Sequence, residues 1–369
     1  MPAAWDITKG NVNVVVGVID TGVDTGHPDL AGNLLPGRDL AGEVRSNEKD
    51  FDNNPMDKNG HGTHVAGIIA AVGNNGIGVA GIGWNLRIMP LKVLADDSPQ
   101  DMETFDIIAA IEYAVAQRVR IVNCSFGGEG DFSQVEYEAF SRLRLAGILA
   151  VCAAGNFARN NDGATPVYPA SYDLDNIISV AASLNPDAQP PKPENLWASS
   201  NYGRNSVDLM APGENIYSTC LCPASGDCNS YCYKSGTSMA APHVAGVAGL
   251  ILSRNPALGY ARVKFLILEL VDPIPSVATK LVSGGRLNAA AALRQVYLPG
   301  DVTGNSAIGV GGMKGSDAIG LDDVILALRI AAGLDTDSSI YRTADVDGDD
   351  RIGLAEAIYG LQVLSGLRE

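Results

Sequence analysis

The stretch GTSMAAPHVAGVAGLILS, from Gly236 to Ser253, predicts a tight turn that runs directly into a buried helix. Thr237 and Ser238 suit the start of a helix, and Pro242 is expected in its first turn, where a missing N–H costs nothing. A helix start presents unpaired N–H groups and partial positive charge, which can stabilise an oxyanion beside a serine. Taken alone, the stretch favours a capping serine on a buried helix, and a nucleophilic serine is the alternative if a base stands next to it.

Apolar runs alternate with helical patterns before this stretch. NVNVVVGVID (11–20) is a β-branched run that ends on Asp20, and GILAVCAAGN (147–156) ends on Asn156. GHGTHVAGIIAAV (60–72) is a loop that passes into a helix, with His61 near its beginning. Such alternation predicts an α/β fold with a parallel sheet covered on both faces. Further strands are expected at 87–94, 119–128, 176–183 and 207–213, and helices at 104–117 and 133–146.

The length, composition and net charge exclude several classes of protein. The chain has 369 residues, 46% of them hydrophobic and 18% charged, which is a globular composition with room for two domains. A net charge of -16 argues against nucleic-acid and anionic-membrane partners and suits the binding of divalent cations. No apolar run approaches the roughly 20 residues that a membrane span needs. No signal peptide is visible, so the sequence is expected to be a processed product.

The cysteines fall into two groups. Cys124 and Cys152 lie in apolar, strand-like runs and are predicted to be buried thiols. Zinc is one reading of the other four, but their spacing is not that of two CxxC pairs. Two disulfides are favoured, in any of three pairings, and with them an oxidising, extracellular compartment. These four share the loop 218–234 and are Cys220, Cys222, Cys228 and Cys232.

The sequence pattern changes after Pro299-Gly300, and an internal repeat follows. IGLDDVILALRIAAGL (319–334) matches IGLAEAIYGLQVLSGL (352–367), and an acidic loop precedes each helical segment. The second loop has the ligand spacing of an EF-hand-type calcium loop, while a merely solvated acidic loop is the alternative. Its expected ligands are Asp345, Asp347, Asp349, the carbonyl of Arg351, and Glu356. An insertion interrupts the ligand spacing of the first loop. Its candidate ligands are Asp301, Thr303, Asn305 and Asp323.

Four distant residues are expected to meet. Asp20 and Asn156 end strands, whereas His61 and Ser238 begin helices, and in a parallel α/β sheet all these ends lie at one edge. Ser238 would attack a carbonyl, His61 would take its proton, and Asp20 would orient the imidazole. The Asn156 side chain and the Ser238 N–H would stabilise the oxyanion.

Four motifs resemble those of the subtilases, the subtilisin-like serine endopeptidases: VIDTG (18–22), HGTHVAG (61–67), AAGN (153–156) and GTSMAAPHVAG (236–246). The resemblance covers about residues 4–293. It implies a subtilisin-like three-layer α/β sandwich with a mainly parallel sheet over residues 1–298, and a secreted endopeptidase activity. A non-catalytic binding protein of the same fold is the alternative, but none of Asp20, His61 and Ser238 is missing.

The resemblance also implies where an extended polypeptide substrate binds as an added strand. Val167 falls where family members often have glycine, so the primary side-chain pocket is expected to be shallow and to take medium-sized apolar side chains. The implied contacts are Ser125, Phe126 and Gly127 on one wall, and Ala153, Ala154 and Gly155 on the other.

Calcium is the implied cofactor. A tight site would use the Asp29 carboxylate, the Asn75 side chain and the carbonyls of Gly73, Ile77 and Val79. The family's N-terminal segment, which supplies a further ligand, is missing, so this site is expected to be weaker. A second, looser site would use Asp50, Asp52 and Asp57.

The repeat at residues 299–369 resembles a type I dockerin, a small all-α calcium-binding domain. The resemblance implies docking to a cohesin module on a scaffold or surface. A calcium-stabilised appendage with no cohesin partner is the alternative.

Overall fold

The computed structural model describes residues 1–41, 51–95, 102–130, 132–185, 194–222 and 230–296, with 328, 358–359 and 361–362. The predicted dockerin-like domain is therefore not tested by the structure. The predicted calcium ligands outside the described residues are Asp50, Asp301, Thr303, Asn305, Asp323, Asp345, Asp347, Asp349, Arg351 and Glu356.

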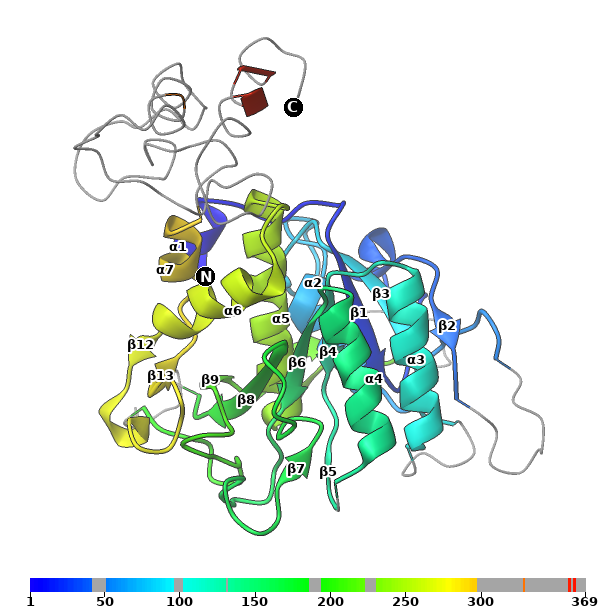
Figure 1. Cartoon of the computed structure of the whole chain (residues 1–369). Helices are drawn as coiled ribbons and strands as arrows, with labels where there is room; N and C mark the ends of the chain where they lie inside the picture. The colour runs from blue at the N-terminus through cyan, green and yellow to red at the C-terminus, as the bar shows by residue number, and fades with distance from the viewer. Residues whose placement is uncertain are drawn as a thin grey trace.

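A nine-stranded sheet forms the middle layer of the described chain, in the order β12-β13-β9-β8-β6-β4-β1-β3-β2 (Figure 1). Every pairing in it is parallel except that of β12 with β13. This confirms the predicted α/β fold with a mainly parallel sheet. In the same order the strands are Asp272–Pro273, Gly285–Arg286, Leu209–Pro212, Ile177–Ser183, Leu149–Ala153, Ile121–Cys124, Val15–Asp20, Arg87–Lys92 and Arg38–Asp39.

Helices cover both faces of the sheet, which explains why its central strands are continuous apolar runs. The first face carries α2 (His61–Ala70), α5 (Thr237–Arg254), α6 (Tyr260–Glu269) and α7 (Ala289–Arg294). The second face carries α3 (Thr104–Ala116) and α4 (Gln134–Leu145). A short helix, α1 (Pro2–Trp5), lies near the amino terminus.

Glycines of α5 bring it close to its neighbours. A Cβ atom on Gly246 would lie 2.6 Å from the Cβ of Ile82. One on Gly249 would lie 2.5 Å from a methyl carbon of Leu86. Larger side chains at either position would therefore push α5 off the segment 82–86.

The strand order reverses between β1 and β4. The chain passes from β1 through α2 to β3 on one side, and then through α3 to β4 on the other side of β1. Such a reversal opens a crevice at the carboxyl edge of an open α/β sheet, where ligands bind. Asp20 ends β1 at this crevice, and Ser125 follows the last residue of β4.

The predicted place of Pro242 is wrong by one turn. Because α5 begins at Thr237, Pro242 lies inside the helix rather than in its first turn. Its missing N–H leaves the Ser238 carbonyl without the usual helical donor. The Ser125 hydroxyl donates to that carbonyl instead, at 2.8 Å, and so ties the start of α5 to the end of β4.

Two short antiparallel pairs flank the crevice. One is β5 (Gly128–Glu129) with β7 (Val167–Tyr168). The other is β10 (Ile216–Thr219) with β11 (Tyr231–Lys234), closed by a disulfide between Cys220 and Cys232. Cys222 is disulfide-bonded as well, which favours the disulfide prediction over zinc. Cys124 and Cys152 are free and buried, as predicted.

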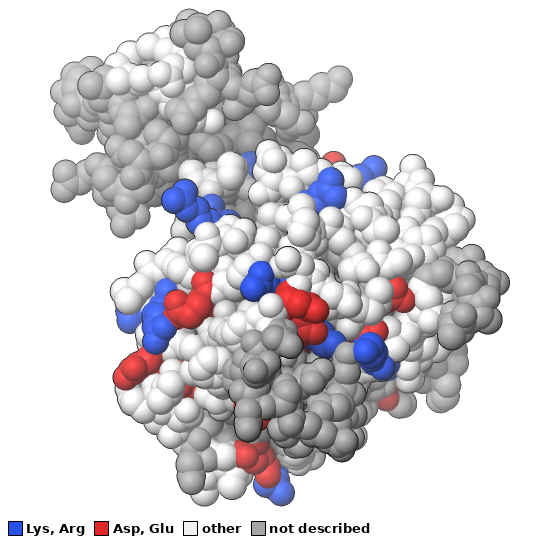
Figure 2. All heavy atoms as spheres, turned by 90° about the vertical axis from the view of Figure 1, so that its right-hand side faces the viewer, with Lys and Arg blue, Asp and Glu red and all other residues white. Residues whose placement is uncertain are grey.

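On the face shown in Figure 2, basic and acidic side chains are interspersed among uncharged ones. The described residues of that face therefore form no continuous basic surface for a nucleic acid. Within the described residues, no helix is long and apolar enough to cross a membrane.

Candidate active site

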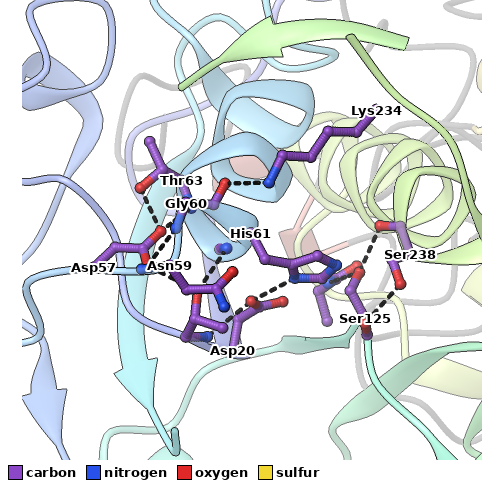
Figure 3. Close-up of polar contacts among 12 residues, drawn as sticks. Asp20, Asp57, Asn59, Gly60, His61, Thr63, Ser125, Lys234 and Ser238 are labelled. Atoms are coloured by element: carbon purple, nitrogen blue, oxygen red, sulfur yellow. Dashed lines mark hydrogen bonds and ion pairs between the residues drawn. The ribbon is translucent and has the colours of Figure 1, made fainter. Parts of the chain in front are cut away.

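Asp20 and His61 meet at the crevice (Figure 3). Asp20 is 2% exposed at the end of β1, and its Oδ1 lies 2.7 Å from Nδ1 of His61, the first residue of α2. The Thr21 N–H also donates to this oxygen, at 2.8 Å. A side chain at Gly62 would collide with the Gly22 carbonyl oxygen, so glycine is needed for α2 to start this close to β1.

The environment of His61 favours its protonated form. Burial lowers the pKa of His61, but the charge of Asp20 and its hydrogen bond together outweigh burial and hold the pKa above its usual value. Lys234 opposes this effect, since its positive charge lowers the pKa of His61. The Lys234 ammonium donates to the Gly60 carbonyl at 3.0 Å, one residue before the histidine (Figure 3).

Asp57 organises the loop that leads into His61, which corrects its predicted role as a calcium ligand. Its carboxylate accepts five hydrogen bonds, from the Thr21 and Thr63 hydroxyls and from the N–H groups of Asn59, Gly60 and Thr63. A carboxylate has about four lone-pair sites, so none remains for a cation. These contacts join the turn after Asp20 to the start of α2 (Figure 3).

Ser238 lies against the end of β4. Its hydroxyl donates to the Ser125 carbonyl at 2.9 Å, and the Ser125 hydroxyl returns a bond to the Ser238 carbonyl. In Figure 3 the His61 ring points from α2 toward this serine pair. Catalytic hydrogen bonds often form only when substrate is present, and a hydroxyl can rotate toward a base. Two hydrogen bonds, one from its hydroxyl and one to its carbonyl, therefore hold Ser238 against Ser125.

Asn156 presents its amide nitrogen to the cleft. Its Oδ1 accepts from the N–H and the hydroxyl of Thr237, at 2.9 and 3.0 Å, which fixes the orientation of the amide. The Thr237 hydroxyl in turn accepts from the Gly155 N–H at 3.1 Å. Ser238 is the second residue of α5, where a helix leaves backbone N–H groups unpaired. Two donors are therefore available beside the Ser238 hydroxyl.

A cavity of about 650 Å³ brings the predicted substrate residues together with Ser238 and Asn156. Two predicted residues lie outside its lining. Ala154 is fully buried in a separate apolar cluster. Val167 is also fully buried and lies behind the pocket, where its methyl groups would be 3.0 and 3.1 Å from Cβ atoms on Gly127 and Gly155. The predicted residues that line the cavity are Ser125, Phe126, Gly127, Ala153 and Gly155.

The sequence prediction missed the end of the cavity formed by α3 and α4. Leu94, Met102, Thr104, Ile107 and Glu136 line it. No motif marks these residues, because only the sheet topology brings the amino ends of two helices to the cleft. The serine–glutamate spacing at the start of α4 was the one signal, and it is equally typical of an ordinary helix start.

Two residues of the predicted tight calcium site, Asn75 and Val79, contact Asp29. This carboxylate is fully buried and accepts from the Asn75 amide at 2.6 Å, the Val79 N–H at 3.0 Å and the Tyr231 hydroxyl at 3.2 Å. In the described chain no lysine or arginine pairs with it. A buried carboxylate that accepts from neutral donors alone has uncompensated negative charge. Carboxylate, amide and carbonyl oxygens, which the predicted site offers, are the ligands that calcium prefers. The residues therefore fit a calcium ion.

Other candidate metal residues have different contacts. Asp52 pairs through its backbone with Asp39 and accepts from the Asn54 N–H at 2.6 Å. Among the described residues, no group of three or more histidine, cysteine, aspartate or glutamate side chains is arranged to hold a metal ion. His64 bonds to the carbonyls of Ile216 and Cys232 at 3.1 and 3.2 Å, and burial lowers its pKa to about 4. It is a structural histidine.

Comparison with known proteins gives consistent matches over the described part of the chain. A family model described as the subtilase family matches residues 11–289. The chain is 39% identical over 286 residues to a thermophilic serine proteinase from a Bacillus species, covering 78% of this chain and 63% of that protein. It is 38% identical over 293 residues to thermitase from Thermoactinomyces vulgaris, covering 79% of this chain and 92% of thermitase.

Two solved structures share the fold. Proteases from Pseudoalteromonas arctica superpose with a TM-score of 0.67 at 31% identity, over 79% of this chain and 92% of theirs. Fervidolysin from Fervidobacterium pennivorans, a keratinolytic enzyme related to subtilisin, superposes with a TM-score of 0.68 at 28% identity, over 80% of this chain and 44% of its own.

Proposed function

This chain belongs to the subtilase family of serine proteases, and on that premise we propose that it is an endopeptidase acting through Ser238, His61 and Asp20. The carrying observation is the 2.7 Å contact between Asp20 and His61 at the sheet edge where α5 begins. The Ser238 oxygen attacks the scissile carbonyl carbon while Nε2 of His61 takes its proton. Asp20 holds the imidazole in the required tautomer and stabilises the imidazolium that forms.

The carbonyl oxygen becomes an oxyanion in this step. The Asn156 amide nitrogen and the Ser238 N–H are the two donors placed beside it. The imidazolium of His61 then gives its proton to the leaving amine, and the acyl group stays on the serine oxygen as an ester. Water deprotonated by His61 attacks that ester, and the same two donors stabilise the second oxyanion.

We place the substrate along Ser125–Gly127 as an added strand. Val167 fills space between Gly127 and Gly155, so a side chain before the scissile bond meets a shallow pocket. Medium-sized apolar side chains suit it. Cleavage of a peptide library tests this function: cuts should follow such residues and disappear on treatment with a serine-directed fluorophosphonate. A folded chain that cleaves no library member would contradict it.

We also place the protein outside the cell. Disulfides such as that of Cys220 with Cys232 persist in oxidising compartments. An extracellular basic protease from Dichelobacter nodosus is 36% identical over 291 residues.

The pH profile reports on His61. Only the neutral imidazole accepts the serine proton, so kcat/KM should rise with pH through the pKa of His61. Because Asp20 raises this pKa, the midpoint should lie above the ordinary value of 6.5. Lys234→Met removes a charge that lowers the pKa of His61, so its midpoint should move to still higher pH.

Steady-state profiles of the wild type, Lys234→Met and Lys234→Arg measure this shift. The arginine variant keeps the charge and serves as the matched control. A wild-type midpoint at or below 6.5, or a Lys234→Met midpoint that moves down, would contradict the assignment.

We propose that calcium binds at Asp29 with Asn75 and the carbonyls of Gly73, Ile77 and Val79. The ion would supply positive charge to a buried carboxylate and tie the loop 73–79 to the segment before η1 (Ala31–Asn33). Because a ligand of the native state stabilises by about 2.7 kcal/mol at a hundredfold excess over its Kd, chelation should lower Tm by several degrees.

Thermal unfolding in calcium and in EDTA tests this site. Asp29→Asn should lose most of the calcium-dependent shift of the catalytic domain, while the matched variant Asp52→Asn should keep it. A transition that EDTA leaves unchanged in the wild type would refute the calcium assignment.

The carboxyl-terminal tail is proposed as a calcium-dependent docking module for a cohesin-type scaffold protein. The repeat of residues 319–334 at 352–367 and the ligand spacing of Asp345–Glu356 support it. The appendage without a partner stays the competing proposal for this segment.

A further inference from the structure

The cavity runs across the edge of the sheet. At one end it is lined by Ser238 and Asn156, at the start of α5 and after β6. At the other it is lined by Ile107 of α3 and Glu136 of α4. Since α5 packs on one face of the sheet and α3 and α4 pack on the opposite face, the cavity extends from the nucleophile's side to the other side. A substrate of several residues is needed to fill it.

Glu136 places a buried negative charge in this cavity. Glu129 and Glu136 are the charged residues among the described lining, and both are acidic. Glu129 forms an ion pair with Arg159. Glu136 is 9% exposed, and the contact to its carboxylate is a hydrogen bond from the Tyr172 hydroxyl, at 2.7 Å. No lysine or arginine of the described chain pairs with it, so its charge is undercompensated.

A role as a helix cap at the start of α4 does not explain why the Glu136 carboxylate lies in the cavity. Ser133 and Glu136 have the spacing of a capping box, in which the glutamate side chain would accept from the Ser133 N–H. The Ser133 hydroxyl does accept from the Glu136 N–H, at 3.4 Å, but the glutamate carboxylate accepts from Tyr172 instead. Burial raises the pKa of Glu136, which is a cost that a solvent-facing cap would avoid.

We propose that Glu136 selects substrates that carry a lysine or arginine side chain upstream of the scissile bond. This inference rests on the proposed peptidase function. A peptide paired with Ser125–Gly127 has its acyl part over this segment, and its preceding residues continue along the cavity. The walls Leu94, Met102 and Ile107 match the aliphatic stem of a basic side chain. The Glu136 carboxylate meets its charged end.

Matched peptides test the selectivity. Each pair carries lysine or its neutral analogue norleucine at the second, third or fourth residue before the same cleaved bond. At one of these positions the wild-type ratio of kcat/KM, lysine over norleucine, should be about tenfold or more. The ratio should fall to about one in Glu136→Gln, which keeps an acceptor for Tyr172. It should be unchanged in Glu138→Gln, which alters an exposed residue of the same helix.

Two outcomes would overturn the inference. One is a wild-type ratio near one at every position. The other is a preference for lysine that Glu136→Gln retains, and a lowered Tm in that variant would then assign the residue to the start of α4. Cleavage without basic selectivity leaves the proposed function standing, whereas a wild type that cleaves none of the peptides contradicts that function and this inference with it.

Discussion

Replacing Ser238 by alanine is expected to lower kcat on a peptide substrate by about 10⁶-fold, a magnitude that comes from a member of the same family. The reason is that Ser238 supplies the proposed nucleophilic oxygen, and the hydroxyl of neighbouring Ser125 is already engaged with the Ser238 carbonyl. The fold should survive, since the Ser238 hydroxyl makes one hydrogen bond, to the Ser125 carbonyl. Steady-state kinetics and thermal unfolding of the same preparation separate loss of chemistry from loss of structure.

A Ser238→Ala variant that still cleaved casein at the wild-type rate would refute the mechanism. The competing reading, a non-catalytic binding protein with a protease fold, makes the opposite prediction for the wild type. It expects a folded, peptide-binding chain with no turnover, so the wild-type rate decides between the two.

Replacing Asn156 by alanine is expected to lower kcat by ~10²–10³-fold with little change in KM, again a range known from a subtilisin of this family. The substrate carbonyl gains little from the Asn156 amide in the ground state, whereas the oxyanion of the transition state depends on it. The orientation of this amide by Thr237 makes the donor available without rearrangement.

Asn156→Asp is the matched variant. It keeps the size of the side chain and an oxygen for Thr237 but removes the N–H donor. It should therefore be as impaired in kcat as Asn156→Ala. If KM rises in either variant while kcat stays at the wild-type value, Asn156 binds substrate rather than stabilising the oxyanion.

The sequence was sufficient for the fold class and for the edge at which the site lies. Asp20 and Asn156 close apolar runs, and His61 and Ser238 open helical ones, so the rule that such ends share an edge brought them together. The helices predicted at residues 104–117 and 133–146 match α3 and α4 to within one residue at each end.

Three features depended on contacts that no local pattern records. Asp57 is an aspartate in an acidic segment, which is typical of calcium ligands. Only the folded loop shows that protein donors occupy its oxygens. Pro242 was predicted in the first turn, where its missing N–H leaves no carbonyl without a donor. In the structure it leaves the Ser238 carbonyl without one, and the Ser125 hydroxyl, distant in sequence, donates to that carbonyl instead. Glu136 has the spacing of a helix cap, and its position in the cleft follows from how α4 packs beside α3.

The joint action of Asp20, His61 and Ser238 has one decisive test: reaction of the folded protein with a fluorophosphonate, followed by peptide mapping of the adduct. The expected result is a single adduct on Ser238 that fails to form in His61→Ala. An adduct on another residue, or a folded wild type that stays unlabelled, would contradict the proposal that these three residues form one hydrolytic centre.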